Sequence, residues 1–116
     1  MRQVLPGPYT FILPASNKVP KILKAQKKTV GIRIPDNLIP RNIVKTLGNP
    51  IISASIKSEE IEYSVDPELI YEKYKKIVDV VIDGGLGDMH SSTVINCSGE
   101  IPELVRAGKG DVTALL

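Results

Sequence analysis

Small hydroxyl side chains and arginines stand at the ends of several strands that the sequence predicts. In open α/β sheets, ligands bind beyond the strand ends, and guanidinium groups with nearby hydroxyls suit phosphate oxygens. Each residue alone is an ordinary turn former or surface charge, but together they predict an anion site. The residues concerned are Thr10, Arg33, Ser53, Ser55, Ser92, Thr93 and Arg106.

Other side chains offer little catalytic chemistry. His90 is the only histidine and Cys97 the only cysteine, so a zinc site has too few nitrogen and sulfur ligands. Cys97 ends an apolar strand, and we expect it to be packed rather than reactive. Gly84-Gly85-Leu86-Gly87-Asp88 has the glycines of a phosphate loop but no following lysine in the Walker spacing, so a turn is expected. We identify no catalytic residue and no protein-bound metal.

The basic residues are concentrated in one stretch, although the formal net charge is only +2. Between residues 18 and 45 the only acid is Asp36. Such a stretch can bind a polyanion such as RNA. A solvated lysine-rich face is the alternative, because aromatic residues that would stack on bases make up only 4% of the chain. The candidate RNA-binding residues are Lys18, Lys21, Lys24, Lys27, Lys28 and Arg41.

The length of 116 residues fits one small domain over 1–116, with hydrophobic and charged fractions typical of a globular protein. No apolar run approaches the roughly 20 residues that cross a bilayer, so no membrane partner is expected. A single cysteine excludes an intrachain disulfide, and the N-terminus lacks the pattern of a signal peptide. We therefore expect the cytoplasm.

Strand-like and helix-like segments alternate along the chain. Predicted strands cover residues 9–13, 29–34, 50–55, 78–82, 92–97 and 103–107, and predicted helices cover 20–26, 37–48, 66–77 and 112–116. The last two strands are joined by too few residues for a parallel crossover, so they should be antiparallel neighbours. The predicted fold class is α/β, with a twisted mixed sheet and helices packed on it.

The two longer helices have recognisable ends and apolar stripes. Asn37 is a capping residue and Gly48 stands where helices commonly stop, while Asp66-Pro67 forms the corresponding start of the next helix. The first helix is amphipathic, with a stripe of Ile39, Ile43, Val44 and Leu47. In the second helix we expect Ile70, Tyr74 and Ile77 to point inward. The apolar run 77–82 is expected to be a buried strand.

Five ordered blocks of the sequence resemble the YrdC/YciO family, which contains the threonylcarbamoyl-AMP synthases. The blocks are Pro6-Gly7-Pro8-Tyr9-Thr10, Gly31-Ile32-Arg33-Ile34-Pro35-Asp36-Asn37, Pro50-Ile51-Ile52-Ser53-Ala54-Ser55, Ser92-Thr93-Val94-Ile95 and Val105-Arg106-Ala107-Gly108-Lys109-Gly110. Their order and spacing match. Two segments look closer to the YciO branch, namely Tyr9-Thr10-Phe11-Ile12-Leu13 and Arg106-Ala107-Gly108-Lys109-Gly110-Asp111-Val112. The chain resembles the C-terminal half of the family's single domain.

The resemblance implies a twisted α/β sheet with a positively charged cavity that binds ATP or AMP, with Mg²⁺ accompanying the nucleotide. Synthases of the family combine threonine, bicarbonate and ATP into threonylcarbamoyl-AMP for tRNA modification, so L-threonine is a further candidate ligand. By match to the family's motifs, the nucleotide-binding residues are Arg33, Ser53, Ser55 and Arg106. The cavity-lining residues are Thr10, Ser92, Thr93 and Lys57.

Two departures from the synthase pattern bear on activity. The family's lysine-arginine pair in the N-terminal half has no counterpart here, and Lys57 stands where the synthases have an asparagine. We therefore expect this chain to be inactive alone and to self-associate through an unfinished sheet. The alternatives are a non-catalytic module that binds double-stranded RNA, and a structural piece without a ligand.

Overall fold

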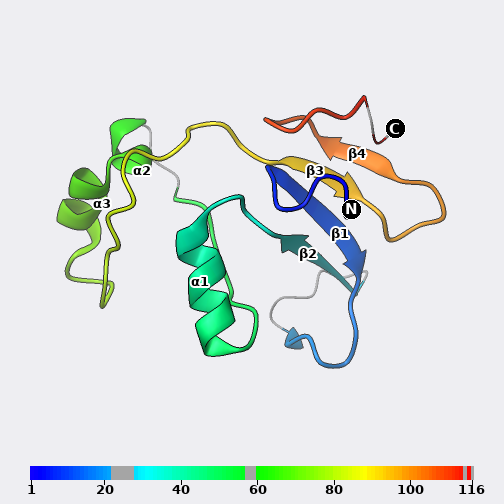
Figure 1. The fold of residues 1–116 in the computed structure, drawn as a ribbon, viewed down its shortest axis with the longest axis horizontal. Helices are drawn as coiled ribbons and strands as arrows, with labels where there is room; N and C mark the ends of the chain where they lie inside the picture. Colours follow the sequence, from blue (N-terminus) through cyan, green and yellow to red (C-terminus); the bar gives the residue numbers. More distant parts are fainter. Residues whose placement is uncertain (22–27, 57–59, 114, 116) are drawn as a thin grey trace. The chain divides into compact units, whose positions relative to one another are not determined.

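The computed structural model describes residues 1–21, 28–56, 60–113 and 115 (Figure 1). The chain divides into two compact units, one of Met1–Arg41 with His90–Leu116 and one of Asn42–Met89. Among the described residues, the first unit contains the strands β1 (Tyr9–Pro14), β2 (Thr29–Arg33), β3 (Thr93–Asn96) and β4 (Glu103–Arg106). Helix α1 (Leu38–Leu47) begins in the first unit, and α2 (Glu62–Val65) and α3 (Pro67–Tyr74) belong to the second.

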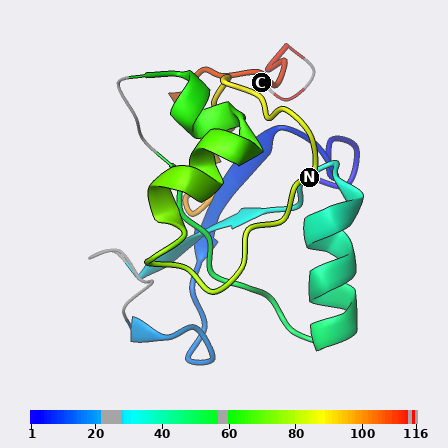
Figure 2. The same cartoon turned by 90° about the vertical axis from the view of Figure 1, so that its left-hand side faces the viewer.

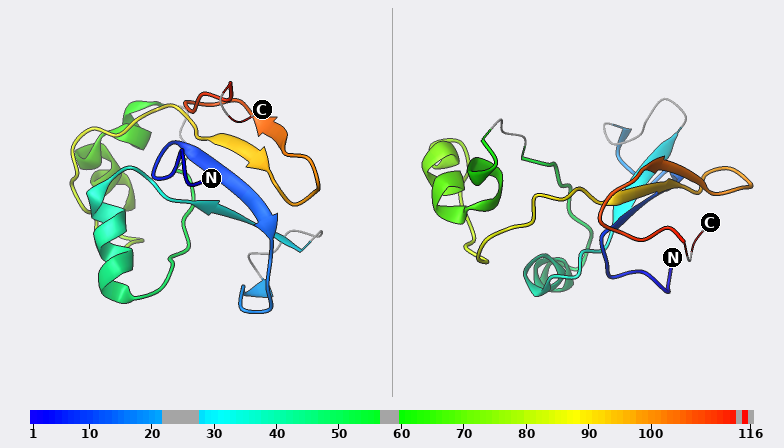
Figure 3. Two further views of the ribbon diagram at one scale, coloured as in Figure 1. Left: turned by 45° about the vertical axis from the view of Figure 1, so that its right-hand side comes forward. Right: turned by 90° about the horizontal axis from the view of Figure 1, so that it is seen from above.

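The four strands form one mixed sheet in the order β2-β1-β3-β4. β1 is antiparallel to β2 and parallel to β3, and β3 is antiparallel to β4. The views in Figure 3 show that the strands twist relative to one another. The prediction of a twisted mixed sheet whose last two strands are antiparallel neighbours is confirmed.

The buried core of the first unit lies on one face of the sheet. Tyr9 and Phe11 on β1 and Ile95 on β3 are its buried apolar side chains, and they share this face because strand residues alternate between faces. The two aromatic rings stack with centroids 6.2 Å apart. The partly buried residues that pack against this core are Val4, Leu5, Leu13, Cys97 and Leu115. The half-buried position of Cys97 beside the core fits the expectation of a packed thiol.

Helix α1 has the predicted ends. Asn37 Oδ1 accepts a hydrogen bond from the Ile39 N–H at 2.9 Å, and Gly48 ends the helix with φ of 85° while its N–H donates to the Val44 carbonyl. No residue of α1 is buried; in its apolar stripe Ile39 and Val44 are half-buried, and Ile43 and Leu47 are exposed. In the described part of the chain, no helix is long and apolar enough to cross a membrane.

Helices α2 and α3 pack against each other in the second unit (Figure 2). Asp66 caps α3, because its Oδ1 accepts a hydrogen bond from the Glu68 N–H at 3.0 Å, and Pro67 occupies the first turn as predicted. The helix ends at Tyr74, earlier than predicted, and Lys75–Ile77 forms a turn. No residue of α3 is buried, but Ile70 and Tyr74 of the predicted inward stripe are half-buried, whereas Ile77 lies beyond the helix and is 78% exposed.

Two predicted strands are not strands in the structure. Residues 50–55 and 78–82 have no strand pairing, and Val80 and Ile82 are 73% and 53% exposed. An apolar run indicates that its side chains favour burial, but a strand also needs a neighbouring strand with which to form hydrogen bonds. The sheet in the described part of the chain has four strands, and neither segment is among them. Most of the predicted helix 20–26 lies outside the described residues. At the C-terminus, residues 112, 113 and 115 form turn and coil rather than the predicted helix.

Candidate anion-binding site

Arg33 and Arg106 lie in one row of residues that crosses the whole sheet. Thr10 on β1 is the register partner of Arg33 on β2 and of Val94 on β3, and Val94 is the partner of Arg106 on β4. Directly opposite residues in paired strands point to the same face. Both arginines and Thr10 therefore lie on the face opposite the Tyr9, Phe11 and Ile95 core.

Two hydroxyl groups stand between the arginines. Thr10 Oγ1 lies 2.8 Å from Ser92 Oγ, and either atom can be the donor. Thr10 is half-buried, whereas Ser92 is only 6% exposed. The pair therefore leaves Thr10 as the more accessible hydroxyl on this face of the sheet.

The guanidinium of Arg106 is oriented by Ser92. Its Nε and Nη2 donate to the Ser92 carbonyl oxygen at 3.1 and 2.9 Å, and Nη2 also donates to Ser92 Oγ at 3.1 Å. Arginine has five N–H donors in a fixed fork. Among the described residues Nη1 has no hydrogen-bond partner, and neither Arg33 nor Arg106 forms an ion pair. Both positive charges are therefore uncompensated by the described part of the chain.

A turn after β4 is tied to the start of β3. Thr93, which is 0% exposed, accepts a hydrogen bond from the Gly108 N–H at 3.2 Å and donates one to the Gly110 carbonyl at 2.7 Å. The Lys109 N–H donates to the Ser91 carbonyl at 2.9 Å. The Tyr9 hydroxyl donates to the Asp111 carbonyl at 2.8 Å. These four bonds fix the segment 108–111 beside the end of β4 that carries Arg106.

The two glycines of this turn are required by close approach. A Cβ on Gly108 would clash with the Ser91 carbonyl oxygen and the Ser92 backbone. A Cβ on Gly110 would lie 2.5 Å from the ring of Tyr9. Gly108-Lys109-Gly110 is therefore a packing requirement of the turn, which the sequence alone did not reveal. Tyr9 was also missed, because its ring belongs to the core and only its hydroxyl reaches the turn.

Asp111 closes the segment with a second set of local bonds. Its Oδ1 accepts hydrogen bonds from the Thr113 backbone N–H at 2.9 Å and from the Thr113 hydroxyl at 2.8 Å. The backbone bond, followed by the hydroxyl bond, lowers the pKa of the Asp111 carboxyl from its ordinary value of 3.8. Asp111 thus closes a turn at the place where the sequence predicted the start of a helix over 112–116.

Two other predicted site residues lie in the second unit. Ser53 and Ser55 are exposed in the irregular segment after α1, and Lys57 lies outside the described residues. A role for the two serines at the Arg33 and Arg106 row stays a prediction. The same holds for Thr93 as a cavity-lining side chain, although its hydrogen bonds already give it a structural task.

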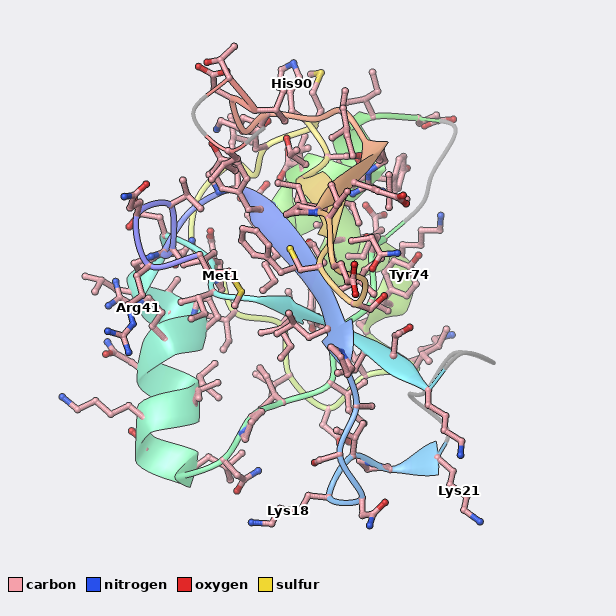
Figure 4. All side chains as sticks on the ribbon, turned by 90° about the vertical axis from the view of Figure 1, so that its right-hand side faces the viewer. Met1, Lys18, Lys21, Arg41, Tyr74 and His90 are labelled. Carbon is pink, nitrogen blue, oxygen red and sulfur yellow. The ribbon has the colours of Figure 1, made fainter. Side chains whose placement is uncertain are left out.

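The structure describes four of the six candidate RNA-binding residues. Lys18, Lys21, Lys28 and Arg41 are exposed, and Figure 4 shows the side chains of Lys18 and Lys21 extending away from the ribbon. Lys24 and Lys27 lie outside the described residues. RNA binding therefore stays a prediction.

Curated relatives match this chain over most of its length. Residues 1–108 match the Sua5/YciO/YrdC family, which carries the description "Telomere recombination". The uncharacterized protein YciO of Escherichia coli K12 is 38% identical over 118 residues, which cover 100% of this chain and 57% of YciO. The threonylcarbamoyl-AMP synthase of Coxiella burnetii RSA 493 is 29% identical and is matched over 54% of its length. The chain thus spans little more than half the length of these relatives.

Solved structures agree with the sequence matches. The crystal structure of E. coli YciO superposes with a TM-score of 0.90 over 100% of this chain and 57% of YciO. P. abyssi Sua5, solved in complex with L-threonine, superposes with a TM-score of 0.77 over 92% of this chain and 32% of Sua5, at 29% identity. By sequence and by fold, the chain belongs to the Sua5/YciO/YrdC family.

Proposed function

We propose that this chain binds the phosphate groups of a nucleotide, ATP or AMP, as part of a YciO-like protein related to threonylcarbamoyl-AMP synthases. The observation that carries the proposal is the row of Arg33, Thr10, Val94 and Arg106 across one face of the sheet. It combines a hydroxyl pair with two guanidinium groups that form no ion pair with any described residue. Charge-assisted hydrogen bonds of this kind are the strongest that a protein offers to phosphate.

The width of the row favours an extended ligand. Arg33 and Arg106 are three strand spacings apart, or roughly 14 Å between backbones at about 4.8 Å for each spacing. A lone phosphate held by Arg106 Nη1 and Thr10 would leave Arg33 unused. A nucleotide, which extends from its phosphates through ribose to base, can meet both arginines. Any Mg²⁺ would arrive with the nucleotide phosphates, which are its usual ligands.

L-threonine is the proposed second ligand. The support comes from relatives, because P. abyssi Sua5 was solved with L-threonine and the C. burnetii protein is named a threonylcarbamoyl-AMP synthase. Since the chain spans 57% of YciO, we propose synthase-type chemistry only for a chain of YciO length and propose that this chain alone is inactive.

Calorimetric titration separates nucleotide binding from RNA binding. ATP, AMP and a short RNA duplex are titrated separately into the protein at two salt concentrations. Saturable binding of ATP or AMP supports the proposal. Duplex binding that weakens steeply with salt, together with no nucleotide binding, would favour the RNA-binding module, because phosphate-backbone contacts release counterions.

A further inference from the structure

We propose that Thr93 is a positioning residue that holds Arg106 and Ser92 in a ligand-ready arrangement without meeting the ligand itself. This inference rests on the proposed function of the row. Thr93 is 0% exposed, and its hydroxyl both accepts from the Gly108 N–H and donates to the Gly110 carbonyl. A hydroxyl has one hydrogen to donate, so none is left for a ligand. Its influence must pass through the groups that it ties together.

Thr93 fixes the backbone on the Arg106 side. Gly108, which it binds, is only two residues beyond Arg106 at the end of β4. The ladder between β3 and β4 is irregular at this point, with a register shift between Val94 and Ile95. Such a bulge leaves a residue unpaired and bends its strand. The hydrogen bonds of the Thr93 hydroxyl therefore hold the backbone next to Arg106 in place, as regular pairing of β3 with β4 would otherwise do.

Thr93 also fixes the group that Arg106 binds. Ser92 immediately precedes it and supplies both acceptors of the Arg106 guanidinium. The Thr93 N–H donates to the Pro8 carbonyl at 2.9 Å, which anchors this part of the chain to the start of β1. The buried Thr93 thus links the end of β4, which carries Arg106, to Ser92, which accepts the hydrogen bonds of the Arg106 guanidinium. Without its hydroxyl, the two can shift relative to each other and to Thr10.

Thr93→Val is the direct variant, because valine keeps the branched shape and removes the hydroxyl. Thr93→Ser keeps the hydroxyl and should rescue the arrangement. Thr29→Val is the matched control, since Thr29 lies on β2 and its side chain has no hydrogen bond to a described residue. Tyr9→Phe is a milder second variant, because it removes only the bond from Tyr9 to the Asp111 carbonyl and keeps the core ring.

The first measurement is the exchange rate of the Arg106 Nε–H proton with water, followed by NMR. In the wild type this proton is protected by its bond to the Ser92 carbonyl. We expect exchange to be roughly five- to tenfold faster in Thr93→Val, the factor for losing about one net hydrogen bond. It should be near wild type in Thr93→Ser and Thr29→Val.

The second measurement is the dissociation constant for ATP by calorimetry, which should rise by about the same factor in Thr93→Val and be restored by Thr93→Ser. A folded Thr93→Val variant with unchanged Arg106 exchange and unchanged ATP affinity would overturn the proposal. If Thr93→Val does not fold, Thr93→Ala, which also removes the hydroxyl, decides: faster Arg106 exchange supports the proposal, and an unchanged rate contradicts it. Tyr9→Phe leaves both Thr93 bonds intact and should change the rate less. If the wild type binds no ATP, the proposed function is refuted instead. The exchange rate of the Arg106 Nε–H proton still tests the positioning role of Thr93 in that case.

Discussion

The Arg106 guanidinium donates two hydrogen bonds to the backbone carbonyl oxygen of Ser92, from Nε at 3.1 Å and from Nη2 at 2.9 Å. This fork fixes the plane of the guanidinium before any ligand arrives. Little side-chain entropy then remains to be lost on binding, which is the usual benefit of preorganisation. Ser92 also joins Thr10 through its hydroxyl, so one buried serine connects β1 to the charge on β4.

Gly110→Ala should destabilise the first unit, because the new Cβ would lie 2.5 Å from the Tyr9 ring. Overpacking of this kind costs about 1 to 3 kcal/mol of the free energy of unfolding. Gly99→Ala is the matched control, since nothing lies within 4 Å of its added Cβ. Urea unfolding of both variants checks the prediction. Equal midpoints for the two would show that the turn does not depend on the Tyr9 contact.

Asp111→Asn should change how stability depends on pH. The Thr113 bonds lower the folded-state pKa of Asp111 below 3.8, so the ionised carboxylate stabilises the folded state above that pH. This contribution is lost as pH falls below 3.8 and through the folded pKa. Wild type should therefore be more stable than Asp111→Asn near neutral pH, with a difference that shrinks in acid. Urea titrations from pH 7 to pH 2 measure it, and a difference that stays constant with pH would contradict the assignment.

The chain should self-associate. By register, Ile32 on β2 and Leu104 on β4 share the sheet face of Phe11 and Ile95, yet they are 42% and 43% exposed. β2 and β4 are also the edge strands of the described sheet, and open edges invite pairing with another chain. Each Å² of apolar surface that association removes from water contributes about 25 cal/mol to the free energy of association.

Light scattering of the protein at millimolar and micromolar concentration measures this association, and Ile32→Lys on the β2 edge should weaken it. The matched control is Ile12→Lys, whose side chain lies on the opposite face of the paired strand β1. A single species with the mass of one chain at all concentrations, without binding of an apolar dye, would contradict the prediction that the exposed apolar side chains and edge strands drive association.

Lys57→Asn should raise pyrophosphate release from ATP in a chain of YciO length that carries these residues. The resemblance places an asparagine at this position in the synthases, and an ammonium group cannot supply the acceptor oxygen of an amide. The assay contains ATP, threonine and bicarbonate, with omission of threonine as its control. A Lys57 parent that already turns over as fast as the C. burnetii synthase would contradict the argument from this position.

The sequence predicted the local features of the fold better than its long-range ones. The caps at Asn37 and Asp66 and the antiparallel β3–β4 pair follow from nearby residues, and all are present. The apolar run 78–82 carries no information about a partner strand, so its predicted pairing was wrong.

The candidate site was predictable as a set of residues but not as an arrangement. Thr10, Arg33 and Arg106 stand out in the sequence at strand ends. Their alignment depends on the parallel pairing of β1 with β3, which joins residues more than 80 positions apart. The buried bonds of Thr93 to the glycine turn depend on the same pairing. No local pattern specifies either of them.

Calorimetry with ATP on Arg33→Ala and Arg106→Ala tests the central claim most directly, with Arg2→Ala as an exposed control in the same unit. Each of the two row variants should weaken ATP binding by about 1 to 3 kcal/mol, the range for a hydrogen bond to a charged group. Arg2→Ala should bind ATP like the wild type. Wild-type affinity for ATP in both row variants would contradict the account, because it would place the nucleotide away from the Arg33 and Arg106 row.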